Sequence, residues 1–206
     1  MTAASWPRRR RGCRWPDMAG AGSADHLAST LASVLASDPW RLRLLRAVAS
    51  LHLPDAWIGA GFVRDAAWDA LHNRPPTPGA GDVDVVWFDA EAPFAEADRA
   101  IEARLSALEP GADWSVTNQA RMHARNSDAP YRDTADAMRH WPETATAVAA
   151  RWDGAGIAVL APLGLEDLLG GVIRPGPGFT GAKRAVMEAR VAAKGWQARW
   201  PLLRVT

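Results

Sequence analysis

The sequence contains a single cysteine, Cys13, among 206 residues, which excludes an internal disulfide framework and a cysteine zinc cage. It also lacks an apolar run approaching the roughly 20 residues that cross a bilayer, so we expect no membrane segment and a cytoplasmic protein. No apolar stretch follows the basic N-terminal residues, as a secretory signal would require. Tryptophan, in contrast, occurs 11 times, which indicates a packed interior or an aromatic-walled cleft.

The formal net charge of +1 hides an asymmetry along the chain. Residues 1–24 carry Arg8, Arg9, Arg10, Arg11 and Arg14 against one acid, Asp17, and leave 19 basic and 22 acidic residues in the remainder. Such a run is either a solvated, disordered tail or a nucleic-acid contact that releases counterions from phosphate. We take residues 1–24 as a disordered basic tail and residues 25–206 as a single domain, with a catalytic core at about 55–165.

Hydrophobic periodicity predicts helices separated by short strands. Asp38-Pro39 is typical of a helix start, and the preceding apolar stripe predicts a second helix that forms an N-terminal hairpin with it. Beyond the hairpin we expect strands at 57–60, 83–88, 114–118 and 157–160, helices at 62–71, 92–108 and 182–194, and a broken helix over 133–151. This order favours an α+β fold, a mixed sheet covered by helices.

Two acids in the most clearly predicted strand are candidate metal ligands. In Gly81-Asp82-Val83-Asp84-Val85 the side chains alternate, so Asp82 and Asp84 share one face about 7 Å apart. Two carboxylates on one face repel each other unless a cation lies between them, and Mg²⁺ is typically held by one or two carboxylates together with substrate phosphates. Alone, the pair favours a solvated strand edge, because Asp-x-Asp is a common pattern.

A glycine turn precedes this strand by about 20 residues. Gly59-Ala60-Gly61 ends a short apolar strand and opens a helix, where free backbone amides and the helix dipole favour an anion. The turn and the acid pair together predict a site for a metal–nucleoside triphosphate.

These motifs resemble a known superfamily. Gly59-Ala60-Gly61-Phe62-Val63-Arg64-Asp65 followed by Asp82-Val83-Asp84 is similar to the signature of the DNA polymerase β-like nucleotidyltransferases, in particular the Gly-Gly-x-Val-Arg-Asp and Asp-x-Asp motifs of CCA-adding enzymes and bacterial poly(A) polymerases. Residues 118–123, 141–144 and 161–167 further resemble a small family of uncharacterised bacterial nucleotidyltransferases. The resemblance covers residues 40–205 and implies a polymerase β-like mixed sheet, an NTP donor and one or two Mg²⁺ ions.

The resemblance also implies roles for individual residues. Asp82 and Asp84 would hold the metal, and the turn would bind phosphate. A third carboxylate is usual on a later strand, where this sequence offers Asp113 at one end and the neutral Asn118 at the other. Ala60 stands where the superfamily often has glycine, a small cost if its φ stays negative.

Four further residues have alternatives that the sequence leaves open. Arg64 and Asp65 either contact the triphosphate or pair with each other. Arg121 and His123, expected in alternation after the third strand, would border the cleft, where a guanidinium clamps phosphate and the histidine is functional or structural.

The expected function is Mg²⁺-dependent transfer of a nucleoside monophosphate from NTP to a hydroxyl acceptor, with release of pyrophosphate. The acceptor, whether a small molecule, a nucleic acid or a protein, is not indicated. The alternative is a catalytically degenerate nucleotide-binding or protein-interaction module of the same fold.

Overall fold

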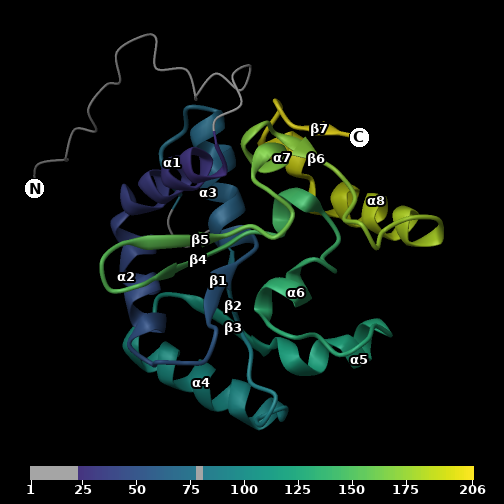
Figure 1. Ribbon diagram of the computed structural model, residues 1–206. Coiled ribbons are helices and arrows are strands. Elements are labelled where there is room, and N and C mark those ends of the chain that lie inside the picture. The colour runs from purple at the N-terminus through teal and green to yellow at the C-terminus, as the bar shows by residue number, and fades with distance from the viewer. Residues whose placement is uncertain (1–22, 78–80) are drawn as a thin grey trace, which may run out of the picture.

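The N-terminal part of the domain is a helical pair. The computed structural model describes residues 23–77 and 81–206 (Figure 1), so the arginine run of the basic tail lies outside the described residues. Helix α1 (Ala24–Ala36) is capped by Ser23, whose hydroxyl accepts from the amide of His26 at 3.4 Å. The domain therefore includes Ser23 and Ala24, which we had assigned to the tail. Helix α2 (Pro39–Ala49) begins at Asp38, whose carboxylate accepts the amide of Trp40 at 3.0 Å, as predicted.

A five-stranded mixed sheet forms the centre of the molecule. Its order is β3-β2-β1-β4-β5, in which β2 and β3 run parallel and the other neighbours are antiparallel. The parallel pair is joined by the long helix α4, the crossover that parallel strands require. The strands are β1 (Trp57–Gly59), β2 (Asp82–Trp87), β3 (Asp113–Asn118), β4 (Ala149–Trp152) and β5 (Ile157–Leu160). The predicted α+β fold is confirmed.

The remaining elements surround this sheet (Figure 1). Two short strands, β6 (Val172–Ile173) and β7 (Arg204–Val205), pair in parallel and were not predicted. The other helices are α3 (Gly61–Leu71), α4 (Ala95–Leu108), η1 (Gln119–Arg121), α5 (Met122–Asn126), α6 (Thr134–Met138), η2 (Thr144–Thr146), α7 (Glu166–Leu169), α8 (Ala182–Lys194) and α9 (Trp196–Arg199). None of the helices in the described part of the chain has the length and apolar character of a membrane span.

The two faces of the sheet are covered differently. One face presents Val83, Val85 and Val116 to the main core, which also contains side chains of α1, α2, α3 and α4. The opposite face carries a smaller cluster around Trp57 and Met138. On β2 this smaller cluster includes Val86, whereas the polar residues at the start of the same strand are not part of it.

The broken helix expected over residues 133–151 is wrong. Only α6 is helical there, after which η2 leads into strand β4. The alanine-rich sequence favours helix locally, but the fully buried Ala149 and Ala150 pair with β1 on one side and β5 on the other. Pairing at the middle of a sheet overrides intrinsic helix propensity.

The C-terminal segment packs on α3 through tryptophans. The rings of Trp196 and Trp200 meet the buried Trp68 edge to face, with centroids 5.4 and 5.1 Å apart. The indole N–H of Trp200 also donates to Asp69 Oδ1 at 2.8 Å. These contacts hold α9 and the end of α8 against the helix that starts at the glycine turn.

Candidate active site

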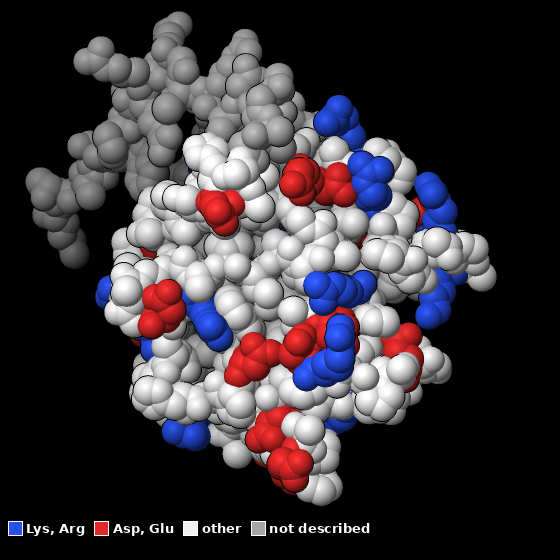
Figure 2. All heavy atoms as spheres, in the orientation of Figure 1, with Lys and Arg blue, Asp and Glu red and all other residues white. Residues whose placement is uncertain are grey.

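The two acids of β2 lie on the same face of the sheet. Val83 and Val85 are 1% and 0% exposed in the main core, so the alternating side chains of Asp82 and Asp84 point to the opposite face. Asp82 is exposed and Asp84 is half-buried. Acidic and basic side chains gather near the middle of the face shown in Figure 2, rather than forming a patch of one sign.

The glycine turn lies next to this acid pair. Strands β1 and β2 are antiparallel, with Trp57 opposite Val86 and Ile58 opposite Val85. Continuing this register places Gly59 opposite Asp84, at the point where β1 ends and α3 begins. Among the described residues, no hydrogen bond takes the amides of Gly61 and Phe62. These amides and the positive end of an 11-residue helix favour an anion there.

Close approach explains the first glycine of the turn. A Cβ at Gly59 would lie 3.0 Å from the ring of Trp141, so the ring would have to shift by a few tenths of an ångström. A Cβ at Gly61 would lie 3.4 Å from Nη2 of Arg64, at the limit of ordinary van der Waals contact.

Ala60 has a strained backbone. Its φ of 51° and ψ of −124° form a conformation that normally requires glycine, so the condition of a negative φ, under which alanine would cost little, is not met. The strain costs about 1–3 kcal/mol and persists because flanking contacts impose it, among them the bond from the Ala60 amide to the carbonyl of Val148 at 3.0 Å.

Replacing Ala60 with glycine is expected to raise the free energy of unfolding by about 1 kcal/mol, because the relief of strain exceeds the entropy cost of glycine. Chemical denaturation measures the change. Ala70→Gly, a matched substitution inside α3, should instead lose about 1 kcal/mol. Equal losses in both variants would contradict the strained turn.

Comparisons with known proteins agree with this geometry. A family model described as nucleotidyltransferase matches residues 46–205. The chain belongs to this nucleotidyltransferase family. A solved structure described as revealing a CCA-adding enzyme head domain is 30% identical, with a TM-score of 0.76, and the match covers 86% of this chain and 95% of that one. No curated protein matches the sequence.

The nucleotidyltransferase holds Asp84 in an unfavourable environment for a free carboxylate. Burial, and next the charge of Asp82, raise the pKa of Asp84 above its ordinary value. The Ser115 hydroxyl and the charges of Arg64 and Lys194 act in the opposite direction. A divalent cation between the two acids would remove their repulsion, so the donor set fits Mg²⁺.

Because the pKa of Asp84 is raised in the folded protein, ionisation of this group costs stability. The cost is absent in acid, develops as the pH rises from the ordinary pKa of the carboxyl group to its raised pKa, and is complete above the raised pKa. Asp84→Asn is therefore expected to raise the melting temperature of the metal-free protein at pH 7, with the difference from wild type shrinking toward pH 4. Thermal unfolding in EDTA measures it. A variant less stable than wild type at pH 7 would contradict the direction of this shift.

Strand β3 supplies a hydroxyl beside the acid pair. Its parallel register sets Asp113 beside Asp82 and Ser115 beside Asp84. Within residues 23–77 and 81–206, no three His, Cys, Asp or Glu side chains are grouped so that they could hold one metal ion. Asp113, expected as a third ligand, thus lies at the exposed rim of the face. Ser115 was missed, although its parity with Asp113 in the strand was a usable signal.

Asn118 is on the wrong face for the cleft. Its side chain is fully buried and bonds the loop after β2, donating to the carbonyls of Asp89 at 2.8 Å and Ala92 at 2.9 Å. Its side-chain oxygen also accepts a hydrogen bond from the amide of Ala120, and this bond caps the start of η1. Asn118 therefore fixes a loop and does not stand where a third carboxylate would.

Arg121 and His123 also depart from the sequence interpretation. Strand β3 stops at Asn118, so these two residues lie in η1 and α5 and do not alternate along a strand. The guanidinium of Arg121 pairs with the buried carboxylate of Asp98 on α4. The ring of His123 bonds the carbonyl of Ala120 at 2.9 Å. Both side chains have structural partners in place of a phosphate.

Arg64 and Asp65 pair with each other, one of the two alternatives left open. Nε and Nη2 of Arg64 donate to Oδ1 of Asp65 at 3.0 and 2.7 Å, and Nη1 donates to Thr146 at 3.3 Å. The guanidinium carbon lies 5.0 Å from the ring centroid of Trp68 and 4.4 Å from that of Trp196. Burial raises the pKa of Asp65, against the effect of the Arg64 charge.

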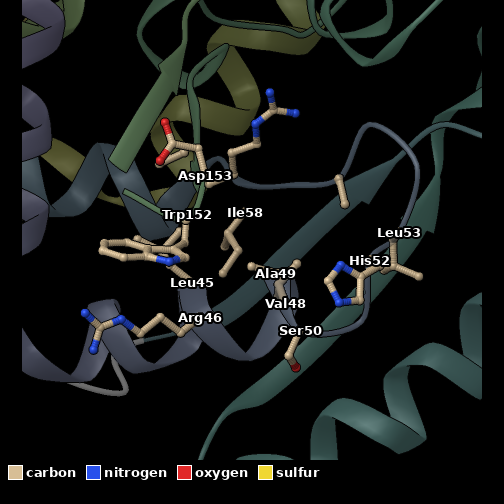
Figure 3. A pocket seen from close by; sticks show the side chains of 14 residues that line it. Leu45, Arg46, Val48, Ala49, Ser50, His52, Leu53, Ile58, Trp152 and Asp153 are labelled. Atoms are coloured by element: carbon tan, nitrogen blue, oxygen red, sulfur yellow. The ribbon is translucent and has the colours of Figure 1, made fainter. Parts of the chain in front are cut away.

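A cavity lies apart from the acid pair. It has a volume of about 560 Å³ and lies between α2 and the β4–β5 hairpin (Figure 3). Its wall includes Val48, Ile58 and Ala150, which face the main core side of the sheet. Neither acid of β2 lines it.

Proposed function

We propose that this nucleotidyltransferase transfers a nucleoside monophosphate from an NTP to a hydroxyl acceptor, with release of pyrophosphate and dependence on Mg²⁺. The observation that supports it is the position of Asp82 and Asp84 on one face beside the amides of Gly61 and Phe62. Carboxylates that hold a metal and amides that hold phosphate are the two parts that a metal–triphosphate needs.

Each part has a separate task. The amides at the start of α3 bind and orient the phosphates, and Asp82 with Asp84 would hold the cation. A bound Mg²⁺ there would offset negative charge on the phosphates and on the leaving pyrophosphate. The acceptor oxygen bonds to the α-phosphorus, the bond from that phosphorus to the bridging oxygen breaks, and the acceptor proton passes to solvent. No side-chain nucleophile is needed, because positioning and charge stabilisation lower the barrier.

Pyrophosphate release tests the proposal. The purified chain is incubated with ATP, CTP, GTP or UTP, with Mg²⁺ or EDTA, and with tRNA, small polyols or a protein mixture as acceptor. Mass spectrometry then identifies the acceptor that gains a nucleotide. Release that needs Mg²⁺ and matches the modified acceptor supports the transfer. Binding of NTP without release, for every acceptor, would contradict it and favour the nucleotide-binding module.

A further inference from the structure

Helix α8 packs on the main core and leads into Trp196, which contacts α3. Nε of Arg190 donates to Oε1 of Glu143 at 3.0 Å, and this carboxylate is fully buried beside η2. Met187 and Val191 of the same helix are buried in the main core. Lys194 follows Arg190 by four residues, so the two side chains lie on the same side of the helix. The Glu143–Arg190 pair therefore sets the direction in which Lys194 points.

The residues after Lys194 attach it to the site. Gly195 has a left-handed conformation, with φ 60°, and ends α8, so that Trp196 turns inward. The buried ring of Trp196 stacks on Arg64, and Arg64 in turn lies against Gly61. The end of α8 is thus fixed to the turn that begins α3. Lys194 directly precedes Gly195, so its side chain begins two residues before the ring that stacks on Arg64 beside the glycine turn.

Lys194 differs from the two arginines that the sequence suggested for phosphate. The guanidinium of Arg64 donates to Asp65 and Thr146, and that of Arg121 pairs with Asp98. Lys194 is exposed, and no ion pair between described residues includes it. Lys and Arg side chains are visible along α8 at the edge of the face in Figure 2. A triphosphate needs such an uncommitted cation.

We propose that Lys194 binds the triphosphate of the NTP, at the phosphates that leave as pyrophosphate. The inference rests on the proposed function, since it names a further substrate contact of the same site. A lysine is suited to this task because its flexible stem carries a compact point charge to the phosphates. A purely structural alternative is the favourable interaction of a cation with the C-terminal end of a helix.

Nucleotide affinity separates these two roles. Isothermal titration calorimetry with each of the four NTPs and Mg²⁺ identifies the NTP that binds wild type most tightly. The matching nucleoside monophosphate is then titrated in the same way. Lys194→Ala is expected to weaken binding of the triphosphate about tenfold, since it removes one charge-assisted contact, and to leave the monophosphate unchanged. Lys194→Arg should recover part of the loss. Lys183→Ala, an exposed lysine at the other end of α8, is the matched control and should bind as wild type does.

Each outcome decides one claim. Wild type that binds no NTP would refute the proposed function itself. Wild-type binding with equal affinity in Lys194→Ala would refute only the role of Lys194. Equal weakening for the triphosphate and the monophosphate would also refute it, because the effect would then not act through the leaving phosphates. A lower melting temperature with unchanged affinity would leave Lys194 as a helix-end charge.

Discussion

Asp84→Asn is expected to lower nucleotidyl transfer about 1000-fold, and Asp82→Asn is expected to have an effect of similar size. Each change removes an anionic ligand from the carboxylate pair of β2 that lies beside the glycine turn. Losing several kcal/mol of charge stabilisation in the transition state corresponds to a rate loss of roughly this size. Pyrophosphate release at saturating NTP and Mg²⁺ measures it.

The control for this prediction is Asp113→Asn. Asp113 is in register with Asp82 but is exposed and belongs to no three-residue metal group among the described residues. We therefore expect it to retain activity within about tenfold of wild type, a loss under roughly 1.4 kcal/mol. A loss as large as that of Asp84→Asn would instead make Asp113 the third ligand that the family resemblance implied. Turnover that survives in both Asp82 and Asp84 variants would reject the proposed site.

Local sequence patterns were sufficient to predict which residues share a face of β2. Strand alternation alone puts Asp82 and Asp84 on one face, because the period of two leaves no other arrangement. The glycine turn followed from a short apolar strand running into a helix. Periodicity alone could not predict that the glycine turn lies beside the acid pair, because this depends on the antiparallel register of β1 and β2. The resemblance to polymerase β-like enzymes supplied that step.

Partners of charged side chains were much less predictable. Arg121 and Arg64 are both basic residues next to a motif. Nothing in the neighbouring sequence shows that Arg121 pairs with Asp98, or that Trp196 stacks on Arg64. Both contacts join residues from different elements, so they follow from packing and not from local pattern. Ala60 shows a similar limit, because its positive φ is imposed by the surrounding turn. Lys194 gave no signal, being 110 residues from Asp84 along the chain.

Arg64→Ala is expected to lower the free energy of unfolding by about 3 kcal/mol, because it leaves the buried Asp65 carboxylate without the guanidinium that donates two hydrogen bonds to its Oδ1. Arg199, the next cation, is 3.7 Å from the other carboxylate oxygen and is itself partly exposed. The change also removes the group stacked on Trp68 and Trp196. Urea denaturation measures the loss.

Two further variants separate the ion pair from general damage. Arg46→Ala removes an exposed arginine that stacks on Trp152 with its guanidinium carbon 4.5 Å from the ring centroid, and it should cost less than about 1 kcal/mol. The double variant Arg64→Met with Asp65→Leu removes both buried charges, and we expect it to regain much of the loss, since apolar replacements of a buried pair are often neutral. If Arg64→Ala instead keeps near wild-type stability while NTP affinity collapses, the guanidinium is a phosphate ligand and the pair with Asp65 is secondary.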